Sequence, residues 1–487
     1  MDRSTAATGS SRPNILLFIP DGMQAAPLAP GSQCHTPNFD RLAERGVRFE
    51  RAHTTCPTCS PARASLMTGL LPHNHGVLEV EHCRDDDQCV LRTDRTHWAT
   101  QLVENGYRTG YFGKWHIERT NQLDHFGWQQ YAFKDNKFIR HMGKGSEGPL
   151  GDIDESLCRR VTGPDGYNTI LHYAATATPV EQRYPGVSLG QTQAFLKDCL
   201  AEDQPWCCCI SFTEPNEALL ASHEALSHYD IDEMELPANL RDDYSQRPNL
   251  YRRVQQVFAD VSDREWREAL ACYYARITEL DKIFGTLYDQ LQDAEALDNT
   301  IIVMVADHGR YVGSHGFDAH NFGAFEEIYN IPLIISGPGI ARGSASRALV
   351  GIHDLYPTLL ELTGTAPVEN LDAHSFAAEL HCPGSQADDF SEGYAEYFGS
   401  RFSLIQRVLW HGPWKMVFNG FDFDELYHLE NDPHEMHNLA DDVQHREIVQ
   451  ELIGRIWNRM RESGDRSILE THYYPMRFAA VGPNPPE

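Results

Sequence analysis

Short, almost wholly apolar segments recur along the chain, and they restrict its fold more than any other feature. The clearest four are NILLFI (14–19), PWCCCISF (205–212), NTIIVMVA (299–306) and IPLIISG (331–337). Apolar runs of strand length without alternation are typical of parallel strands buried on both faces of a sheet. Helical patterns separate them, most clearly in residues 36–46, 188–202, 262–294 and 353–364. This alternation predicts an α/β fold in which helices flank a large, doubly wound and mainly parallel sheet.

The character of the sequence changes after residue 382. Residues 382–393 have the composition of a linker, residues 407–419 alternate around a Gly-Pro turn as a β-hairpin does, and residues 445–463 form an amphipathic helical pattern. We therefore predict a large domain of residues 1–385 and a small C-terminal α+β domain of residues 386–487 with an antiparallel sheet. Residues 134–188 are rich in Gly, Pro and polar residues, and we predict that they are an insertion in the large domain.

The charge of the chain excludes several classes of partner. Its formal net charge is −29, and only seven of its 41 basic residues are lysines. Nucleic acid and anionic membranes are therefore poor partners. No segment approaches the roughly 18 consecutive apolar residues that span a bilayer. The N-terminal residues do not show the basic, apolar and small-residue regions of a signal peptide, so we expect a cytoplasmic protein.

Polar residues follow two of the apolar segments directly. Asp21 comes after the segment 14–19, and Asp307 and His308 come after the segment 299–306. Ligands of open α/β sheets bind at the carboxyl ends of the strands, so these side chains are expected at one edge of the sheet. Two carboxylates and one imidazole fit a divalent cation such as Ca²⁺ or Mg²⁺.

Cys56 and Cys59 lie just before an expected helix. A zinc half-site would need a second pair, and the nearest candidates, Cys83 and Cys89, are separated by five residues instead of two. A redox pair would leave the acidic strand ends without a role. Both thiols could also be buried structural residues, and we expect most of the twelve cysteines to be reduced and buried.

A fourth interpretation gives Cys59 an anion-binding position. Ser60 and Pro61 have the composition of a helix N-cap and first-turn residue, which would place residue 59 at the positive end of a helix. Backbone N–H groups at such an end suit a sulfate or a phosphate.

The segment Cys59-Ser60-Pro61-Ala62-Arg63, followed by LMTG, resembles the signature of the type I, formylglycine-dependent sulfatases of the alkaline phosphatase superfamily. Further segments also resemble that family: RPNILLFIPDG, TPNFDRLAERGVRFERAHT, GYFGKWH, VADHGRYVGSHG and FDELYHLENDPHEMHNLA. The resemblance covers most of the chain apart from residues 134–188 and 216–260. It implies that the large domain is the catalytic domain, that a formylglycine-generating enzyme oxidises Cys59 to formylglycine, and that Cys56 is a bystander.

The resemblance also implies a set of functional residues. The ligands of the divalent cation would be Asp21, the converted Cys59, Asp307 and His308. Ca²⁺ would be the first choice, with Mg²⁺ or Mn²⁺ as alternatives. The catalytic residues would be Cys59, Arg63, Lys114 and His116. Arg63 would neutralise charge beside residue 59, and Lys114 and His116 would contact the sulfate or the formylglycine. Asn216, His320 and Asn321 would bind the substrate.

The implied activity is the hydrolysis of a sulfate ester of a sugar or small alcohol by the hydrated formylglycine. A phosphonate monoester or phosphodiester hydrolase of the same superfamily is the first alternative, and a catalytically weakened binding protein for sulfated ligands is the second.

The sequence departs from the usual sulfatase pattern in three places. Gly22 replaces a second aspartate, Asn216 replaces a leaving-group histidine, and His320 and Asn321 stand where a lysine is usual. We hypothesise that His320 or His116 protonates the leaving alcohol instead.

Overall fold

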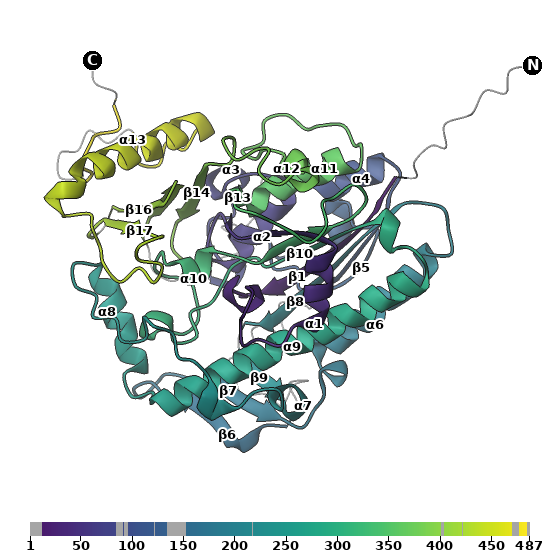
Figure 1. Ribbon diagram of the computed structural model, residues 1–487, viewed down its shortest axis with the longest axis horizontal. Helices are drawn as coiled ribbons and strands as arrows, with labels where there is room; N and C mark the ends of the chain where they lie inside the picture. Colours follow the sequence, from purple (N-terminus) through teal and green to yellow (C-terminus); the bar gives the residue numbers. More distant parts are fainter. Residues whose placement is uncertain are drawn as a thin grey trace, which may run out of the picture.

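A single large sheet runs through the middle of the protein (Figure 1). The computed structural model describes residues 12–83, 91, 96–120, 122–133, 152–216, 218–400, 404–420, 422–469 and 477–484. Within these residues the sheet has eight strands, in the spatial order β12-β2-β11-β10-β1-β8-β4-β5. Their bounds are β1 Asn14–Asp21, β2 Gly46–Phe49, β4 Arg108–Gly113, β5 Gln130–Phe133, β8 Trp206–Pro215, β10 Thr300–Val305, β11 Leu333–Ser336 and β12 Ser344–Ser346. Only β11 is antiparallel to its neighbours among these strands, which confirms the predicted mainly parallel sheet.

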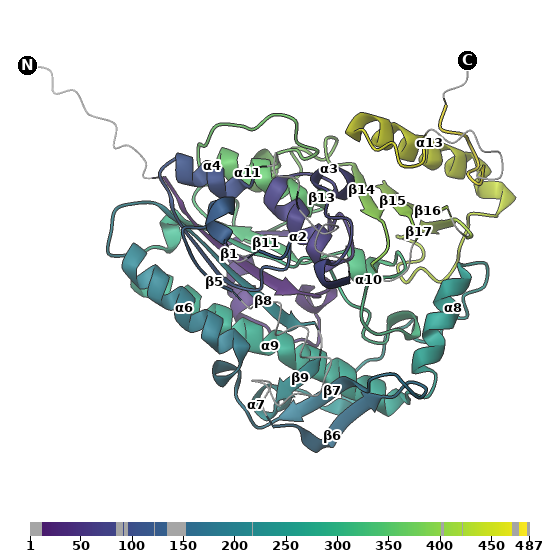
Figure 2. The same cartoon turned by 180° about the vertical axis from the view of Figure 1, so that it is seen from behind.

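Helices cover both faces of this sheet, as the alternating pattern predicts (Figures 1 and 2). One face carries α1 (Pro37–Glu44), α6 (Tyr184–Cys199) and α9 (Asp263–Asp293). The other face carries α2 (Cys59–Thr68), α4 (Trp98–Glu104) and α11 (Leu355–Leu362). The central strand β1 is therefore buried from Ile15 to Asp21, which explains why its sequence is apolar without alternation.

A second, antiparallel sheet lies in the C-terminal part of the chain. It consists of β14 (Glu392–Tyr397), β15 (Gln406–His411), β16 (Trp414–Asn419) and β17 (Glu425–His428), which pair in chain order. The predicted hairpin of residues 407–419 is formed by β15 and β16. Helix α13 (Arg446–Ser463) packs its apolar stripe on this sheet, and the stripe consists of Val449, Leu452, Ile453, Ile456, Trp457 and Met460. The antiparallel C-terminal sheet is confirmed, whereas the domain boundary after residue 385 stays a prediction.

The predicted insertion contributes a third, smaller sheet. Strands β6 (Asp154–Val161) and β7 (Ile170–Thr176) are antiparallel, and β9 (Leu219–Ser222) pairs with β7 in parallel. The described part of the insertion is thus ordered into strands, which its Gly- and Pro-rich composition did not predict. Residues 134–151 of the insertion lie outside the described residues.

Several short elements complete the described structure. They are β3 (Ala52–His53), β13 (Val350–Gly351), α3 (Pro72–His75), α7 (His223–Leu226), α8 (Asn249–Gln255), α10 (Glu326–Tyr329) and α12 (Ala377–His381). No described helix combines the length and the apolar character that a membrane span requires. The eleven described cysteines are free thiols and eight of them are buried, as expected from the sequence.

The long helix α9 begins with a capping box that can be tested alone. The Ser262 hydroxyl accepts a hydrogen bond from the Glu265 N–H, and the Glu265 carboxylate accepts from the Ser262 N–H. We expect Ser262→Ala to lower the free energy of unfolding by about 1 kcal/mol, measured by urea denaturation. Thr286→Ala, at an exposed position within α9, is the matched control and should not destabilise the protein, because alanine favours helix. Equal losses in both variants would contradict a role for the cap.

Candidate active site

Most of the predicted site residues meet at the carboxyl edge of the large sheet. Asp21 ends β1, and Asp307 follows β10 by two residues. Lys114 follows β4, and Asn216 follows β8. Because β4, β8, β1 and β10 are consecutive parallel neighbours, their carboxyl ends lie together. The sheet therefore brings four segments of the chain, separated by up to about 290 positions, to one place.

Cys59 is the first residue of α2, at its N-terminus, as expected. The expected cap is wrong, however, because the N-cap is Thr58 and not Ser60. The backbone of Thr58 is still extended, so the helix begins one residue after it, and the Ser60 hydroxyl accepts from the Glu81 N–H at 3.2 Å. Pro61 is then the third helical residue, where its missing N–H costs no intrahelical hydrogen bond. Residue 59 therefore still lies at the N-terminus of the helix, where backbone N–H groups suit an anion.

The Cys59 thiol faces polar groups from the end of β1 and from the segment that follows β10. Its Sγ lies 3.1 Å from His308 Nε2 and 3.8 Å from both Asp21 Oδ1 and His320 Nε2. Burial, together with the charge of Asp21, raises the pKa of the thiol, so the unmodified side chain is a poor nucleophile.

Cys56 is fully buried beside Tyr397 and belongs to no candidate ligand cluster among the described residues. The position of Cys56 fits a structural residue. Of the two cysteines considered as its partners in a zinc site, Cys89 lies outside the described residues.

Arg63 holds the two predicted metal carboxylates together. Its Nε donates to Asp307 Oδ2 at 2.7 Å, and one terminal nitrogen donates to Asp21 Oδ2 at 3.0 Å. The remaining N–H groups bind the Ser211 hydroxyl and the backbone oxygens of Lys114 and Phe212. The guanidinium is fully buried, and it offsets charge beside residue 59 by binding the aspartates rather than by approaching Cys59 directly.

The donor set fits a divalent cation. Ligand atoms of Asp21, Cys59, Asp307 and His308 all lie within 4.8 Å of one another. His308 Nδ1 is 2.8 Å from the backbone oxygen of Gly309, so Nδ1 carries the proton and Nε2 keeps its lone pair toward the cluster. Although burial alone would raise it, Lys114 and Arg63 hold the pKa of Asp21 well below its usual range. Two carboxylates and an imidazole suit Ca²⁺, Mg²⁺ or Mn²⁺, and an oxygen at residue 59 would suit such a cation better than the sulfur.

Lys114 and His116 differ in their surroundings. The Lys114 ammonium donates to Asp21 Oδ2 and so belongs to the carboxylate cluster. His116 Nε2 instead lies 3.2 Å from His82 Nδ1 and 3.6 Å from Glu81 Oε1. Burial, reinforced by the nearby Lys114 charge, lowers the pKa of His116 well below its usual value. Glu81 and His82 were not predicted as neighbours of His116, because no pattern in the sequence connects them to it.

His320 lies against the cluster around Cys59, and Asn321 is the next residue along the chain. The His320 ring stacks on His308, with the ring centroids 4.1 Å apart, and Asn321 has a left-handed backbone with φ of 75°. The hydroxyl of Tyr397 donates to the backbone oxygen of Asn321. Among the described residues, His320 Nδ1 and Asn321 Oδ1 have no hydrogen-bond partner although both are buried. Such atoms are costly unless a ligand pairs with them. The substrate contacts expected of both residues stay predictions.

The Asn216 side chain makes hydrogen bonds within the protein. Its amide nitrogen donates to Asp21 Oδ1 at 2.6 Å, and its amide oxygen accepts from Arg310 at 2.9 Å. Each end of the amide therefore has one partner within the protein, and the predicted role of Asn216 in substrate binding stays a prediction. Arg310 was not predicted as part of the site, although it follows His308 by only two residues.

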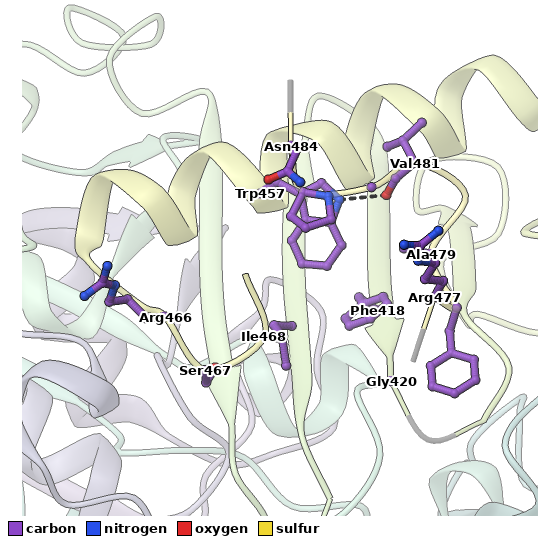
Figure 3. A pocket seen from close by; sticks show the side chains of 13 residues that line it. Phe418, Gly420, Trp457, Arg466, Ser467, Ile468, Arg477, Ala479, Val481 and Asn484 are labelled. Atoms are coloured by element: carbon purple, nitrogen blue, oxygen red, sulfur yellow. Dashed lines mark hydrogen bonds between the residues drawn. The ribbon is translucent and has the colours of Figure 1, made fainter. Parts of the chain in front are cut away.

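A separate cavity of about 640 Å³ lies in the C-terminal part of the protein (Figure 3). Its lining includes Phe418, Trp457 and residues 477–484, and Trp457 Nε1 donates to the backbone oxygen of Val481 at 2.9 Å. No residue of the predicted site lines this cavity, so the cavity is not part of the cluster around Cys59.

Comparison with known proteins gives consistent matches over nearly the whole chain. The profile of the family described as Sulfatase matches residues 13–365, and the profile described as N-sulphoglucosamine sulphohydrolase, C-terminal, matches residues 313–462. A choline-sulfatase of Rhizobium meliloti (strain 1021) is 28% identical over 455 residues, which cover 89% of this chain and 83% of that protein.

Two solved structures share the fold. A phosphonate monoester hydrolase from Silicibacter pomeroyi has a TM-score of 0.77 at 20% identity, and the match covers 95% of this chain and 98% of that chain. A protein bound to its substrate D-glucosamine-2-N,6-O-disulfate has a TM-score of 0.75 at 21% identity, and the match covers 94% and 99% of the two chains. Both likenesses support the same α/β architecture with its C-terminal antiparallel sheet.

The position of Arg63 between two buried aspartates predicts a large effect on stability. Arg63→Met leaves Asp21 and Asp307 without their shared partner, and we expect the free energy of unfolding to fall by about 3–5 kcal/mol in urea denaturation. Arg241→Met is the control, because Arg241 and its partner Asp263 are both exposed and their pairing should not contribute measurably. A variant at Arg63 with the stability of the unmodified protein would contradict this account of the cluster.

Proposed function

We propose a reaction from one premise: the chain belongs to the sulfatase family, whose profile matches well over half of its residues. Its activity is that of a sulfatase, the hydrolysis of sulfuric esters. The further proposal is that the reaction takes place at Cys59, after conversion of this residue to formylglycine, with a divalent cation held by Asp21, Asp307 and His308. The observation that carries it is the position of Cys59 Sγ, at a helix N-terminus and 3.1 Å from His308 Nε2.

Residue 59 and the cation would together supply an oxygen nucleophile for attack on the sulfur of the ester. The role of the surrounding residues follows from their charges. Arg63 keeps the two aspartates at a fixed separation and offsets their charge. Lys114 adds a second positive charge beside Asp21, where it can also attract the sulfuryl oxygens. The N–H groups at the start of α2 favour the same anion.

His320 is a better candidate than His116 for protonating the leaving alcohol. His320 Nε2 lies 3.8 Å from Cys59 Sγ, and the Nδ1 of this ring has no partner among the described residues. The Nε2 of His116 is already close to His82 and Glu81. Asn216 cannot supply the proton, because an amide does not ionise and both ends of this amide are engaged.

For the substrate we propose a sulfated sugar or a small sulfated alcohol. The relative named choline-sulfatase and the structural neighbour bound to a glucosamine disulfate support these two classes. Gly22 at the position of a second aspartate, and the fold shared with a phosphonate monoester hydrolase, keep phosphonate monoesters as the alternative. The binding-protein alternative is less favoured, because ligand atoms of Asp21, Asp307 and His308 lie within 4.8 Å of the Cys59 thiol.

The first experiment compares kcat/KM for an aryl sulfate and an aryl phosphonate monoester, with protein co-expressed with a formylglycine-generating enzyme. We expect the sulfate to be preferred. Cys59→Ala should reduce turnover to the background rate without unfolding the protein, because it removes the nucleophile. Cys56→Ala is the matched control and should keep conversion and turnover. Preference for the phosphonate would move the assignment to the alternative, and turnover by Cys59→Ala would contradict the proposed nucleophile.

The proposed role of His320 makes a second, independent prediction. In His320→Ala, kcat for an alkyl sulfate should fall by about 10²–10⁴-fold, because an alkoxide is a poor leaving group without a proton. kcat for a nitrophenyl sulfate should change far less, since its leaving group needs no protonation. His116→Ala is the comparison variant and should affect both substrates to the same extent. Equal effects of His320→Ala on both esters would show that another group donates the proton.

A further inference from the structure

Asn216 connects the candidate cation site to a charged pair outside it. Asp21 Oδ1, which accepts from the Asn216 amide, is also the oxygen that lies 3.8 Å from both Cys59 Sγ and His308 Nε2. The other carboxylate oxygen of Asp21 is bound by Lys114 and Arg63. The amide of Asn216 thus contacts the one Asp21 oxygen that faces the ligand cluster.

Arg310 determines which end of the amide faces Asp21. A guanidinium has only N–H donors, so the atom of Asn216 at 2.9 Å from Arg310 must be the amide oxygen. The NH₂ group is then directed to Asp21 Oδ1. With the amide turned by 180°, two oxygen acceptors would face each other at 2.6 Å, which is unfavourable in a buried site.

Arg310 is itself fixed on its other side. Its Nε and second terminal nitrogen donate to the two oxygens of Asp318 at 2.9 and 2.7 Å, in a bidentate pair. His172 Nε2, from strand β7, lies 3.1 Å from Asp318 Oδ2. All of these side chains are buried, and the exposed fraction of Arg310 is 2%. A continuous row of polar contacts therefore extends from the small sheet of β6, β7 and β9 to Asp21.

We propose that Arg310 is a positioning residue for cation binding, which acts through Asn216 on Asp21. The inference rests on the proposed function, because it concerns the cation that this function requires. Arg310 contributes by holding the Asn216 amide with its donor toward Asp21. Residues that orient a metal ligand in this way typically change metal affinity by about 10–100-fold when they are replaced.

The test is a double-mutant cycle on the dissociation constant of Mn²⁺, measured with converted protein by electron paramagnetic resonance of the free ion. We expect Asn216→Ala and Arg310→Met each to raise the Kd of Mn²⁺ by about 10–100-fold. In the double variant the Kd should be no higher than in Asn216→Ala, because Arg310 acts only through that side chain. Independent, multiplied effects of the two substitutions would overturn the proposed route.

Arg407→Met is the matched control for loss of a buried arginine. Arg407 makes a comparable pair with Asp465 in the C-terminal part of the protein, at 2.7 and 3.0 Å. This variant should lose thermal stability and keep the Kd of Mn²⁺ within twofold of the unmodified protein. If Arg310→Met fails to fold because Asp318 is left unpaired, Arg310→Met combined with Asp318→Leu removes both charges together and should show the same increase in Kd.

The failure of this inference is distinguishable from failure of the proposed function. If the unmodified protein binds Mn²⁺ and the Arg310 variants bind it equally well, the positioning role is overturned and the proposed reaction stands. If the unmodified protein binds no divalent cation and still hydrolyses the ester, the cation role and the inference are both overturned.

Discussion

The active-site end of the sheet depends on one buried interaction, the contact of the Arg63 guanidinium with Asp21 and Asp307. The two aspartates end neighbouring parallel strands, and without a shared cation their charges would repel in a region from which water is excluded. Arg63 resolves this conflict from the first turns of α2, the helix that also begins with Cys59. The same interaction therefore fixes the helix on the sheet and holds its first residue, Cys59, beside the carboxylates.

The parts of the fold that follow from local patterns were predictable. The strand at residues 14–19, the long helix α9 and the hairpin of β15 and β16 each carry their signal within a short stretch of sequence. Strands β6 and β7 were not predicted, because their residues alternate weakly and their stability depends on pairing with β9, more than 40 residues later. The start of α2 was misplaced because Ser60 and Pro61 resemble a cap, while the extended backbone of Thr58 decides where the helix begins.

The residues of the candidate site can also be divided into those that were predictable from the sequence and those that were not. Asp21, Asp307 and His308 could be identified because each directly follows an apolar strand, and parallel strands must bring their ends together. The partners of Asn216 and His116 could not be identified, because they depend on how loops from distant segments cross the edge of the sheet. A substitution in a familiar motif, such as Asn216, can be recognised from sequence, but its new contacts come from residues that the motif does not contain.

The small sheet of β6, β7 and β9 has a consequence for anyone who modifies this protein. Two of its strands, β6 and β7, come from a segment that composition alone would mark as dispensable, yet His172 on β7 lies against Asp318, the partner of Arg310. Deleting the hairpin to obtain a smaller enzyme, or grafting another loop in its place, would expose a charged pair that is now dry. Exchange of this loop would thus also disturb a row of contacts that reaches Asp21 through Arg310 and Asn216.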